Sequence, residues 1–440
     1  MPIRSPNKEL NFTNNMGTGK VLNYIMKKSL KSKNLEDIDL INKASVDEVI
    51  SEVNSIFSKL NGLSSETIEV YLSDNKENII NRLLEIGDTN GRCLSSLGDG
   101  LQYSFNIFLN ILELIVHLKT TKKEEDYENL MIKDKEGKKY LPLIIGLDEP
   151  EIHQHPYRQR ALIKSIRKII DNENEDFLKI INELFGIDGF IGQVFVVTHS
   201  PSILLDDYKQ IVRVFKKDGI VDSTSGSLLD FGEDIHKHLK RSFMYFKEAM
   251  FSKKIILVEG DTEFGAVPVF AESLGLDLDK QGVGIVKLDG ADGVLKYLKL
   301  FEAFNIDAIA ILDKDKEIEY SNNENIYFTE KIDFEEEMFD MFSFKQYLEY
   351  LQSINKHNFL IRYLNNKVEG FKPREFVEKP LSYYIPEEVG KEIMSEIRVT
   401  EIEELRDIKN TVRGALLAKY VDNVPESFKV VINKAVLGCN

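Results

Sequence analysis

Asp148 and Glu149 are the first residues whose type and placement suggest chemistry. They follow the apolar run at residues 143–147, which predicts a buried strand. A carboxylate at the end of such a strand can hold Mg²⁺, and a second one can polarise the water that attacks a nucleotide phosphate. A solvated turn is the alternative interpretation, because acidic residues are common at strand ends. His199 comes two positions after the strand predicted at residues 193–197, which is apolar from Val194, and it could contact the γ-phosphate or that water; a structural role is the alternative.

A second group of acids follows two further apolar runs. Asp313 and Asp315 come after residues 308–312, and Glu259 comes after residues 255–258. Side chains two positions apart in an extended segment point the same way, so Asp313 and Asp315 are expected to face one metal site. Glu259 would complete that site if the two strands are neighbours. Carboxylates that hold one or two Mg²⁺ or Mn²⁺ ions can activate water and stabilise the leaving oxygen in phosphodiester cleavage.

The segments after these strands offer further ligands. Glu263 lies one helical turn past Glu259, which makes it a candidate ligand for a second metal. Asp333 or Glu335, in the segment KIDFEEEM, is another candidate. Solvated acids at the start of a helix are the competing interpretation for this last pair, and neither interpretation is favoured.

Residues 93–102, CLSSLGDGLQ, place serines and glycines directly before a long apolar segment. Backbone N–H groups and hydroxyls at a helix N-terminus can face an anion, and a glycine-rich turn with a serine cap is the alternative. The segment at residues 101–119 is apolar enough to suggest a membrane span. A stripe of polar side chains argues against a span and predicts a core helix. The stripe consists of Gln102, Asn106, Asn110, Glu113 and His117.

Residues 14–20, NNMGTGK, match the phosphate-loop pattern Gly-x-x-x-x-Gly-Lys-Ser/Thr only in part. Asn14 stands in place of the first glycine, and Val21 in place of the hydroxyl that would ligate Mg²⁺. No apolar strand is expected before this segment, so a flexible loop is the favoured interpretation.

Length and composition restrict the class of protein. A chain of 440 residues predicts two or three domains, and 42% hydrophobic with 30% charged residues is ordinary for a globular protein. The net charge of −16 argues against a globally basic nucleic-acid binder, but allows a local groove or a metal-mediated contact with phosphates. Cys93 and Cys439 cannot form a zinc site or a disulfide framework, which fits a cytoplasmic protein. The N-terminus has no signal-peptide pattern.

The first half of the chain resembles the ATPase head of the ABC and SMC type. LSSLGDGLQ is similar to the signature segment, LIIGLDEP to the Walker B strand, and VFVVTHSPSIL to the switch-histidine strand. The resemblance implies that Asp148 organises Mg²⁺, Glu149 activates water and His199 senses the γ-phosphate. It also implies that Ser96 and Gly98 contact the nucleotide of a partner head, so that two copies dimerise for hydrolysis.

The second half resembles a TOPRIM domain, because KIILVEGDTE is followed at a suitable distance by Asp313-Lys314-Asp315. The two halves together resemble the OLD family of ATP-dependent endonucleases, which includes the nuclease subunit of the Gabija antiphage system. The implied fold is α/β, with a partial ABC-type head at residues 1–250, a helical insertion near residues 20–65, and a TOPRIM nuclease domain with a C-terminal helical segment at residues 251–440. The largely parallel sheet of the TOPRIM domain is Rossmann-like.

The resemblance also implies an activity and partners. They are cleavage or nicking of DNA with Mg²⁺ or Mn²⁺, regulation by ATP, a homodimer or higher homo-oligomer joined through the head, a second defence protein, and no membrane. The setting is antiphage defence or DNA repair in a bacterium. The family places a basic residue near the C-terminus to stabilise the transition state. Lys409, Arg413 and Lys419 are the candidates, and Arg413 is taken as the catalytic one.

The chain departs from the family pattern at its N-terminus, where only the defective NNMGTGK is found. Either the phosphate-loop region is missing or ATP binding has been lost, which puts the ATPase activity of this chain alone in doubt. Two other functions remain open. One is an SMC-like repair ATPase whose TOPRIM domain only binds DNA, and the other is a non-catalytic partner of a complete ATPase.

Overall fold

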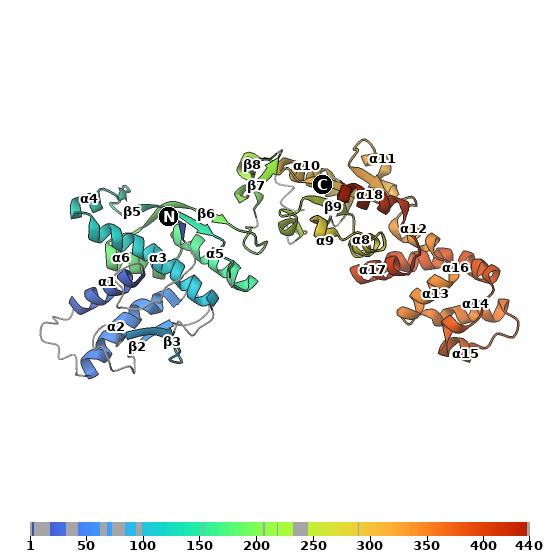
Figure 1. Ribbon diagram of the computed structural model, residues 1–440, viewed down its shortest axis with the longest axis horizontal. Coiled ribbons are helices and arrows are strands. Elements are labelled where there is room, and N and C mark those ends of the chain that lie inside the picture. The colour runs from blue at the N-terminus through green and yellow to red at the C-terminus, as the bar shows by residue number, and fades with distance from the viewer. Residues whose placement is uncertain are drawn as a thin grey trace. The chain divides into compact units, whose positions relative to one another are not determined.

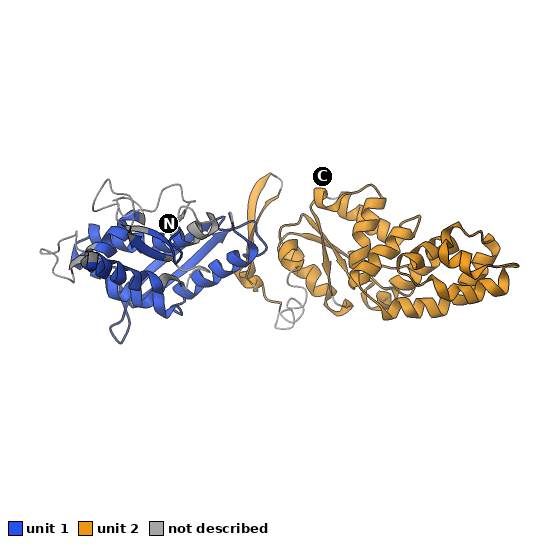
Figure 2. Ribbon diagram, turned by 90° about the horizontal axis from the view of Figure 1, so that it is seen from below, with its two compact units in different colours: residues 1–203 blue, residues 204–440 orange. Residues whose placement is uncertain are grey.

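The computed structural model describes residues 2–3, 18–31, 43–61, 68–72, 84–93, 99–152, 154–205, 207–217, 219–231, 245–288 and 290–437. The chain divides into two compact units, Met1–Ile203 and Leu204–Asn440, which Figure 2 shows in different colours. The sequence predicted a division near residue 250. The structure instead groups the segment that begins at Leu204 with the second unit.

The first unit is built around strand β5, Lys139–Asp148 (Figure 1). β6, Gly189–Val197, pairs with β5 in parallel from Tyr140 to Asp148. The short strands β1, Pro2–Ile3, and β4, Ile132–Lys133, pair with the two ends of β5. Alternate residues of β5 are buried because side chains along a strand point to opposite faces of the sheet. The buried ones are Leu141, Leu143, Ile145 and Leu147.

Helices complete the first unit. They are α1 (Thr18–Lys31), α2 (Lys43–Asn61), α3 (Asp99–Thr121), α4 (Glu124–Glu128), α5 (Pro156–Ile170) and α6 (Glu175–Phe185). A hairpin of β2 (Ile68–Leu72) and β3 (Leu84–Asp88) packs beside α2. α3 confirms the predicted core helix, because its apolar side chains from Ile107 to Val116 are largely buried. Within the described residues, no helix is long and apolar enough to cross a membrane.

The second unit contains a four-stranded sheet in the order β10-β9-β11-β12. The strands are β9 (Lys254–Val258), β10 (Val283–Lys287), β11 (Asp307–Leu312) and β12 (Ile326–Phe328), and every pairing is parallel. The fold class predicted from the sequence, α/β with a largely parallel sheet in this domain, is confirmed. β9 and β11 are neighbours, with Val258 opposite Ile311. Their carboxyl ends therefore meet at one edge of the sheet.

Both faces of this sheet are covered, which explains why its strands are apolar throughout. Ile256 and Val258 point into one hydrophobic cluster together with α8 (Asp261–Ser273), α12 (Phe334–Met341) and α18 (Glu426–Leu437). Ile255 and Leu257 point to the opposite face, into a cluster with α10 (Val294–Ala303) and with residues 246–250.

A helical layer follows the sheet in sequence. It consists of α13 (Phe344–Ser353), α14 (Leu360–Lys367), α15 (Pro373–Glu378), α16 (Glu387–Asp407) and α17 (Thr411–Tyr420). α17 crosses α8 at two glycines that allow very close contact. A Cβ atom on Gly265 would lie 1.9 Å from the carbonyl oxygen of Thr411, and one on Gly414 would lie 1.8 Å from that of Thr262. This crossing places the start of α17 beside the start of α8.

A hairpin of two antiparallel strands, β7 (Val212–Lys217) and β8 (Ile220–Ser225), lies near the start of the second unit. Arg213 fixes the hairpin to the rest of the second unit. Its guanidinium donates hydrogen bonds to the carbonyl oxygens of Met250, Ser252, Phe304 and Asn305, at 2.9–3.2 Å. These carbonyls lie just after helical segments, where a cation is favoured.

Candidate functional site

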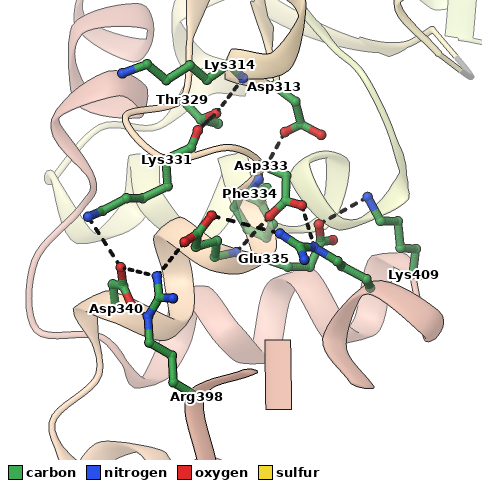
Figure 3. A network of polar contacts seen from close by, with 12 residues as sticks. Asp313, Lys314, Thr329, Lys331, Asp333, Phe334, Glu335, Asp340, Arg398 and Lys409 are labelled. Atoms are coloured by element: carbon green, nitrogen blue, oxygen red, sulfur yellow. Dashed lines mark hydrogen bonds and ion pairs between the residues drawn. The ribbon is translucent and has the colours of Figure 1, made fainter. Parts of the chain in front are cut away.

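The carboxyl ends of β9 and β11 bring Glu259 and Asp313 together. The backbone N–H of Asp313 donates a hydrogen bond to Oε2 of Glu259 at 3.2 Å. The carboxylate of Asp313 accepts another from the N–H of Phe334, at 3.0 Å (Figure 3). Asp313 is only 8% exposed. The predicted metal site required β9 and β11 to be neighbouring strands, and they are paired directly.

A second pair of acids lies beside the first, on the starts of α8 and α12. Glu263 and Glu335 are 3% and 0% exposed. The hydroxyl of Thr262 lies 3.0 Å from Oε1 of Glu335 and 3.2 Å from Oε2 of Glu263, so it bridges the two side chains. The ammonium of Lys409 lies 3.0 Å from Oε2 of Glu335 (Figure 3). Glu259, Glu263, Asp313 and Glu335 together are called the carboxylate centre below.

The acids of the carboxylate centre act on one another electrostatically. Burial, reinforced by Glu335, raises the pKa of Glu263 to about 7. Burial and the neighbouring Glu263 and Glu259 raise the pKa of Asp313 to about 8. Burial also raises the pKa of Glu259, and Asp315 adds to that effect. Negative charge is therefore concentrated in a place with little solvent, where it is unfavourable unless a cation or a proton compensates it.

Lys409 supplies part of that compensation. Burial lowers the pKa of its ammonium, but the charges of Glu335, Glu263 and Asp313 outweigh burial and raise it. Lys409 is therefore charged and directed at the carboxylate centre. One ammonium cannot balance the charge of several carboxylates, so the centre retains capacity for a further cation.

The chemistry of this donor set fits a hard divalent cation, because Mg²⁺ and Mn²⁺ prefer oxygen ligands. Among the described residues, no three acidic, histidine or cysteine side chains are grouped closely enough to hold a metal ion as they stand. The acids instead form two pairs, Glu259 with Asp313 and Glu263 with Glu335. A metal ion would thus have to draw their side chains together.

The direction of the Asp315 side chain differs from the predicted one. The sequence argument assumed an extended segment from 313 to 315, but only Asp313 is extended, and Lys314–Lys316 form a 3₁₀ turn. The turn separates the directions of the two side chains. Asp315 is half exposed and pairs with the ammonium of Lys316 at 3.0 Å. It remains near enough to Glu259 to raise the pKa of that acid.

The structure also separates the alternatives that the sequence left open. Asp333 caps α12, and its carboxylate pairs with Arg406 at 2.6 Å, whereas Glu335 lies in the carboxylate centre. Arg413, taken as catalytic from the sequence, is 9% exposed and donates its Nε hydrogen bond to the hydroxyl of Tyr350 in the helical layer. Lys409 is the basic residue that contacts the acids.

Sequence reasoning did not single out Thr262. It lies between Glu259 and Glu263 within the motif VEGDTE, and it is fully buried. Its position one residue before Glu263 was the only available signal. The bridge from Thr262 to Glu335 joins residues 73 positions apart, so the sequence could not reveal it.

The predicted nucleotide site of the first unit is assembled in part. Asp148 ends β5 opposite Val197 at the end of β6. Glu149 follows with φ of 46°, a left-handed conformation that is uncommon for residues other than glycine and often marks functional turns. Its carboxylate lies 3.6 Å from Nε2 of His199. The structure therefore brings Glu149 and His199 together.

A polar network that the sequence did not predict supports this turn. One oxygen of Glu151 accepts hydrogen bonds from the hydroxyl of Thr198, at 2.8 Å, and from the N–H of His199, at 2.7 Å. The hydroxyl of Ser200 donates to Gln159 of α5 at 2.6 Å. The segment after β6 is thus tied to the segment after β5 and to α5.

Ser96 and Gly98, the other residues that the resemblance implied to contact a nucleotide, lie outside the described residues. Lys20, from the partial phosphate loop, lies within α1 rather than in a loop. Lys20 is near Glu113 of α3. Burial raises the pKa of the Glu113 carboxyl, and the charge of Lys20 offsets only part of that increase. A two-residue strand, β1, does precede this segment and pairs with β5, which the sequence did not predict.

Comparisons with known proteins agree with this architecture. The family described as an AAA ATPase domain matches residues 4–204, and the TOPRIM domain of proteins like the overcoming lysogenization defect (OLD) protein matches residues 250–315. No curated protein matches the chain.

Two solved structures are similar to part of this chain. The C-terminal region of the Burkholderia pseudomallei OLD protein has 17% identity and a TM-score of 0.28, covering 43% of this chain and 100% of its own. The C-terminal region of the Xanthomonas campestris pv. campestris OLD protein has 16% identity and a TM-score of 0.25, covering 44% of this chain and 96% of its own.

Proposed function

We propose that this chain, which has the OLD-family order of an AAA ATPase domain followed by an OLD-like TOPRIM domain, is a metal-dependent DNA endonuclease regulated by its ATPase domain. The observation that carries this proposal is the carboxylate centre, with buried acids of raised pKa at the carboxyl edge of a parallel sheet. Ligand sites of open α/β sheets lie at that edge. Perturbed pKa values are typical of functional sites.

Each residue of the centre has a role in this proposal. Glu259 and Asp313 would hold a Mg²⁺ or Mn²⁺ ion, and Glu263 or Glu335 would contribute to a second one. Bound there, such ions supply an activated water and stabilise the leaving oxygen of a phosphodiester. Lys409 would neutralise charge that develops on the phosphate, in place of Arg413.

The DNA contact is proposed to be local and metal-mediated, since the net charge of the chain is −16. The proposed setting is antiphage defence or DNA repair in the bacterial cytoplasm. Joining of two or more copies through the ATPase domain, and cooperation with a second defence protein, belong to the same proposal.

Nicking of supercoiled plasmid tests the nuclease. The wild-type chain should nick the plasmid with Mn²⁺ or Mg²⁺ and not with EDTA, and Asp313→Asn should abolish nicking. Asp307→Asn is the matched control, because Asp307 is at the opposite end of β11 and its side chain is 79% exposed. Equal activity of Asp313→Asn and wild type would refute the assignment of the centre.

A second candidate function concerns the ATPase domain alone. The departures of the partial phosphate loop from its pattern, Asn14 in place of the first glycine and Val21 in place of the hydroxyl residue, favour a domain that does not hydrolyse ATP by itself. ATP hydrolysis by the wild type that Glu149→Gln abolishes would support an active domain. Nicking without ATP hydrolysis would support a regulatory or non-catalytic one.

A further inference from the structure

An ion pair joins the start of α12 to α16, next to the carboxylate centre. Nε of Arg406 donates to Oδ2 of Asp333 at 2.6 Å. The other oxygen of Asp333 accepts the N–H of Glu336 at 2.9 Å, which caps α12. Both oxygens of Asp333 are therefore used, one to start the helix and the other to attach it to α16.

The turn that Asp333 starts is the turn that contacts the carboxylate centre. The N–H of Phe334 donates to Oδ1 of Asp313 at 3.0 Å (Figure 3). The next residue, Glu335, accepts from Thr262 at 3.0 Å and pairs with Lys409. A rotation of this turn would move the donor that orients Asp313 and the acid that pairs with Lys409 at the same time.

Arg406 and Lys409 reach this turn from the same side. Arg406 lies in the last turn of α16, and Lys409 follows two residues after that helix ends. Arg406 pairs with Asp333 and, at 3.9 Å, with Glu336, whereas Lys409 pairs with Glu335. The turn is thus held by two cations from a single short segment. The helical layer is in this way connected to the edge of the sheet.

We propose that Arg406 is a positioning residue of the carboxylate centre: by holding Asp333 it fixes the first turn of α12 and with it the orientation of Asp313. This inference rests on the proposed function, because it assumes that the centre binds a metal ion. Residues that orient metal ligands through hydrogen bonds typically alter metal affinity or activity 10-fold to 100-fold when they are replaced.

A neighbouring ion pair provides a matched control. Arg398 also lies on α16, also pairs with acids of α12, and has nearly the same exposure as Arg406, 37% against 38%. Its partners are Glu336 and Asp340, with bonds of 2.7 and 2.9 Å to Asp340 (Figure 3). Arg398 therefore contributes a similar link between the two helices but does not touch Asp333.

The test is calorimetric titration of the full chain with Mn²⁺, in the wild type, Arg406→Gln, Asp333→Asn and Arg398→Gln. Asparagine caps helices as well as aspartate does, so Asp333→Asn removes the ion pair and keeps the cap. Arg406→Gln and Asp333→Asn should each raise the Kd for Mn²⁺ about 10-fold. The double variant should be no weaker than either single one, and Arg398→Gln should match the wild type within about 2-fold.

The outcomes distinguish this inference from the proposed function. Absence of Mn²⁺ binding by the wild type would refute the proposed function itself. Binding by the wild type with equal affinities for Arg406→Gln and Arg398→Gln would overturn the positioning role alone. Weakening by Arg406→Gln without weakening by Asp333→Asn would also overturn it, because the effect would not then pass through Asp333.

Discussion

Replacing Gly414 by alanine tests how α8 and α17 are held together. The added Cβ would lie 1.8 Å from the carbonyl oxygen of Thr262 and 2.6 Å from its carbonyl carbon. Carbon atoms normally approach no closer than about 3.5 Å, so the helices would have to separate by more than about 1 Å. The clash is with backbone, which cannot rotate away as a flexible side chain can.

Two opposing effects determine the size of the change. Alanine is favoured over glycine inside a helix by about 1 kcal/mol. Overpacking costs about 1–3 kcal/mol, and a clash with backbone belongs at or above the upper end of that range. The free energy of unfolding of the second unit should therefore fall by about 2 kcal/mol. Because Thr262 bridges Glu263 and Glu335, nicking should fall as well.

Urea denaturation followed by circular dichroism measures this change. Ser395→Ala is the control, since Ser395 is exposed on α16 and its replacement should shift the free energy of unfolding by no more than about 0.5 kcal/mol. A Gly414→Ala variant as stable as the wild type, or more stable by the helix preference of alanine, would refute the described crossing.

Three further predictions concern charge. Burial and neighbouring acids raise the pKa of Glu263 to about 7 and of Asp313 to about 8, well above the about 4 of the unfolded chain. The contribution of these two carboxyl groups to the free energy of unfolding of the EDTA-treated protein should therefore be fully present below about pH 4. It should decrease as the pH rises and be lost above about pH 7–8. Urea unfolding at several pH values should show this loss, and saturating Mn²⁺ should reduce it; a pH-independent contribution would contradict it. Lys409→Met should lower the nicking rate at least about 100-fold, while the exposed Lys419→Met should not, and equal rates would argue against Lys409 as the basic residue. Arg213→Met removes the bonds to carbonyl oxygens after two helical segments and should destabilise the second unit by about 2 kcal/mol in thermal or urea unfolding. Arg213→Lys should recover part of that loss, and an unchanged stability of Arg213→Met would contradict the anchoring role.

The elements that carry the acids could be predicted because their signals are local. Apolar runs before Asp148, Glu259 and Asp313 identified β5, β9 and β11, and the long apolar segment with its polar stripe identified α3. α6 was not predicted, although Asn174 caps its start and Gly186 ends it with φ of 70°. Those signals were present in the sequence and were not used.

The errors and open choices depend on contacts that sequence spacing does not encode. Asp315 departs from the predicted direction because the chain turns into a 3₁₀ helix immediately after Asp313. The choice between Lys409 and Arg413 depends on where α16 ends and α17 begins, since that junction directs one side chain to Glu335 and the other to Tyr350. Both differences arise from tertiary packing.

The most direct test of the carboxylate centre is to locate the metal ion itself. Crystals of the full chain grown with Mn²⁺ should show anomalous scattering at the carboxyl ends of β9 and β11, within about 2.5 Å of oxygens of Glu259 and Asp313. The same position should be vacant in crystals of Asp313→Asn grown under identical conditions. A Mn²⁺ ion bound elsewhere in the wild type, with none at these carboxylates, would contradict the proposed metal-dependent nuclease.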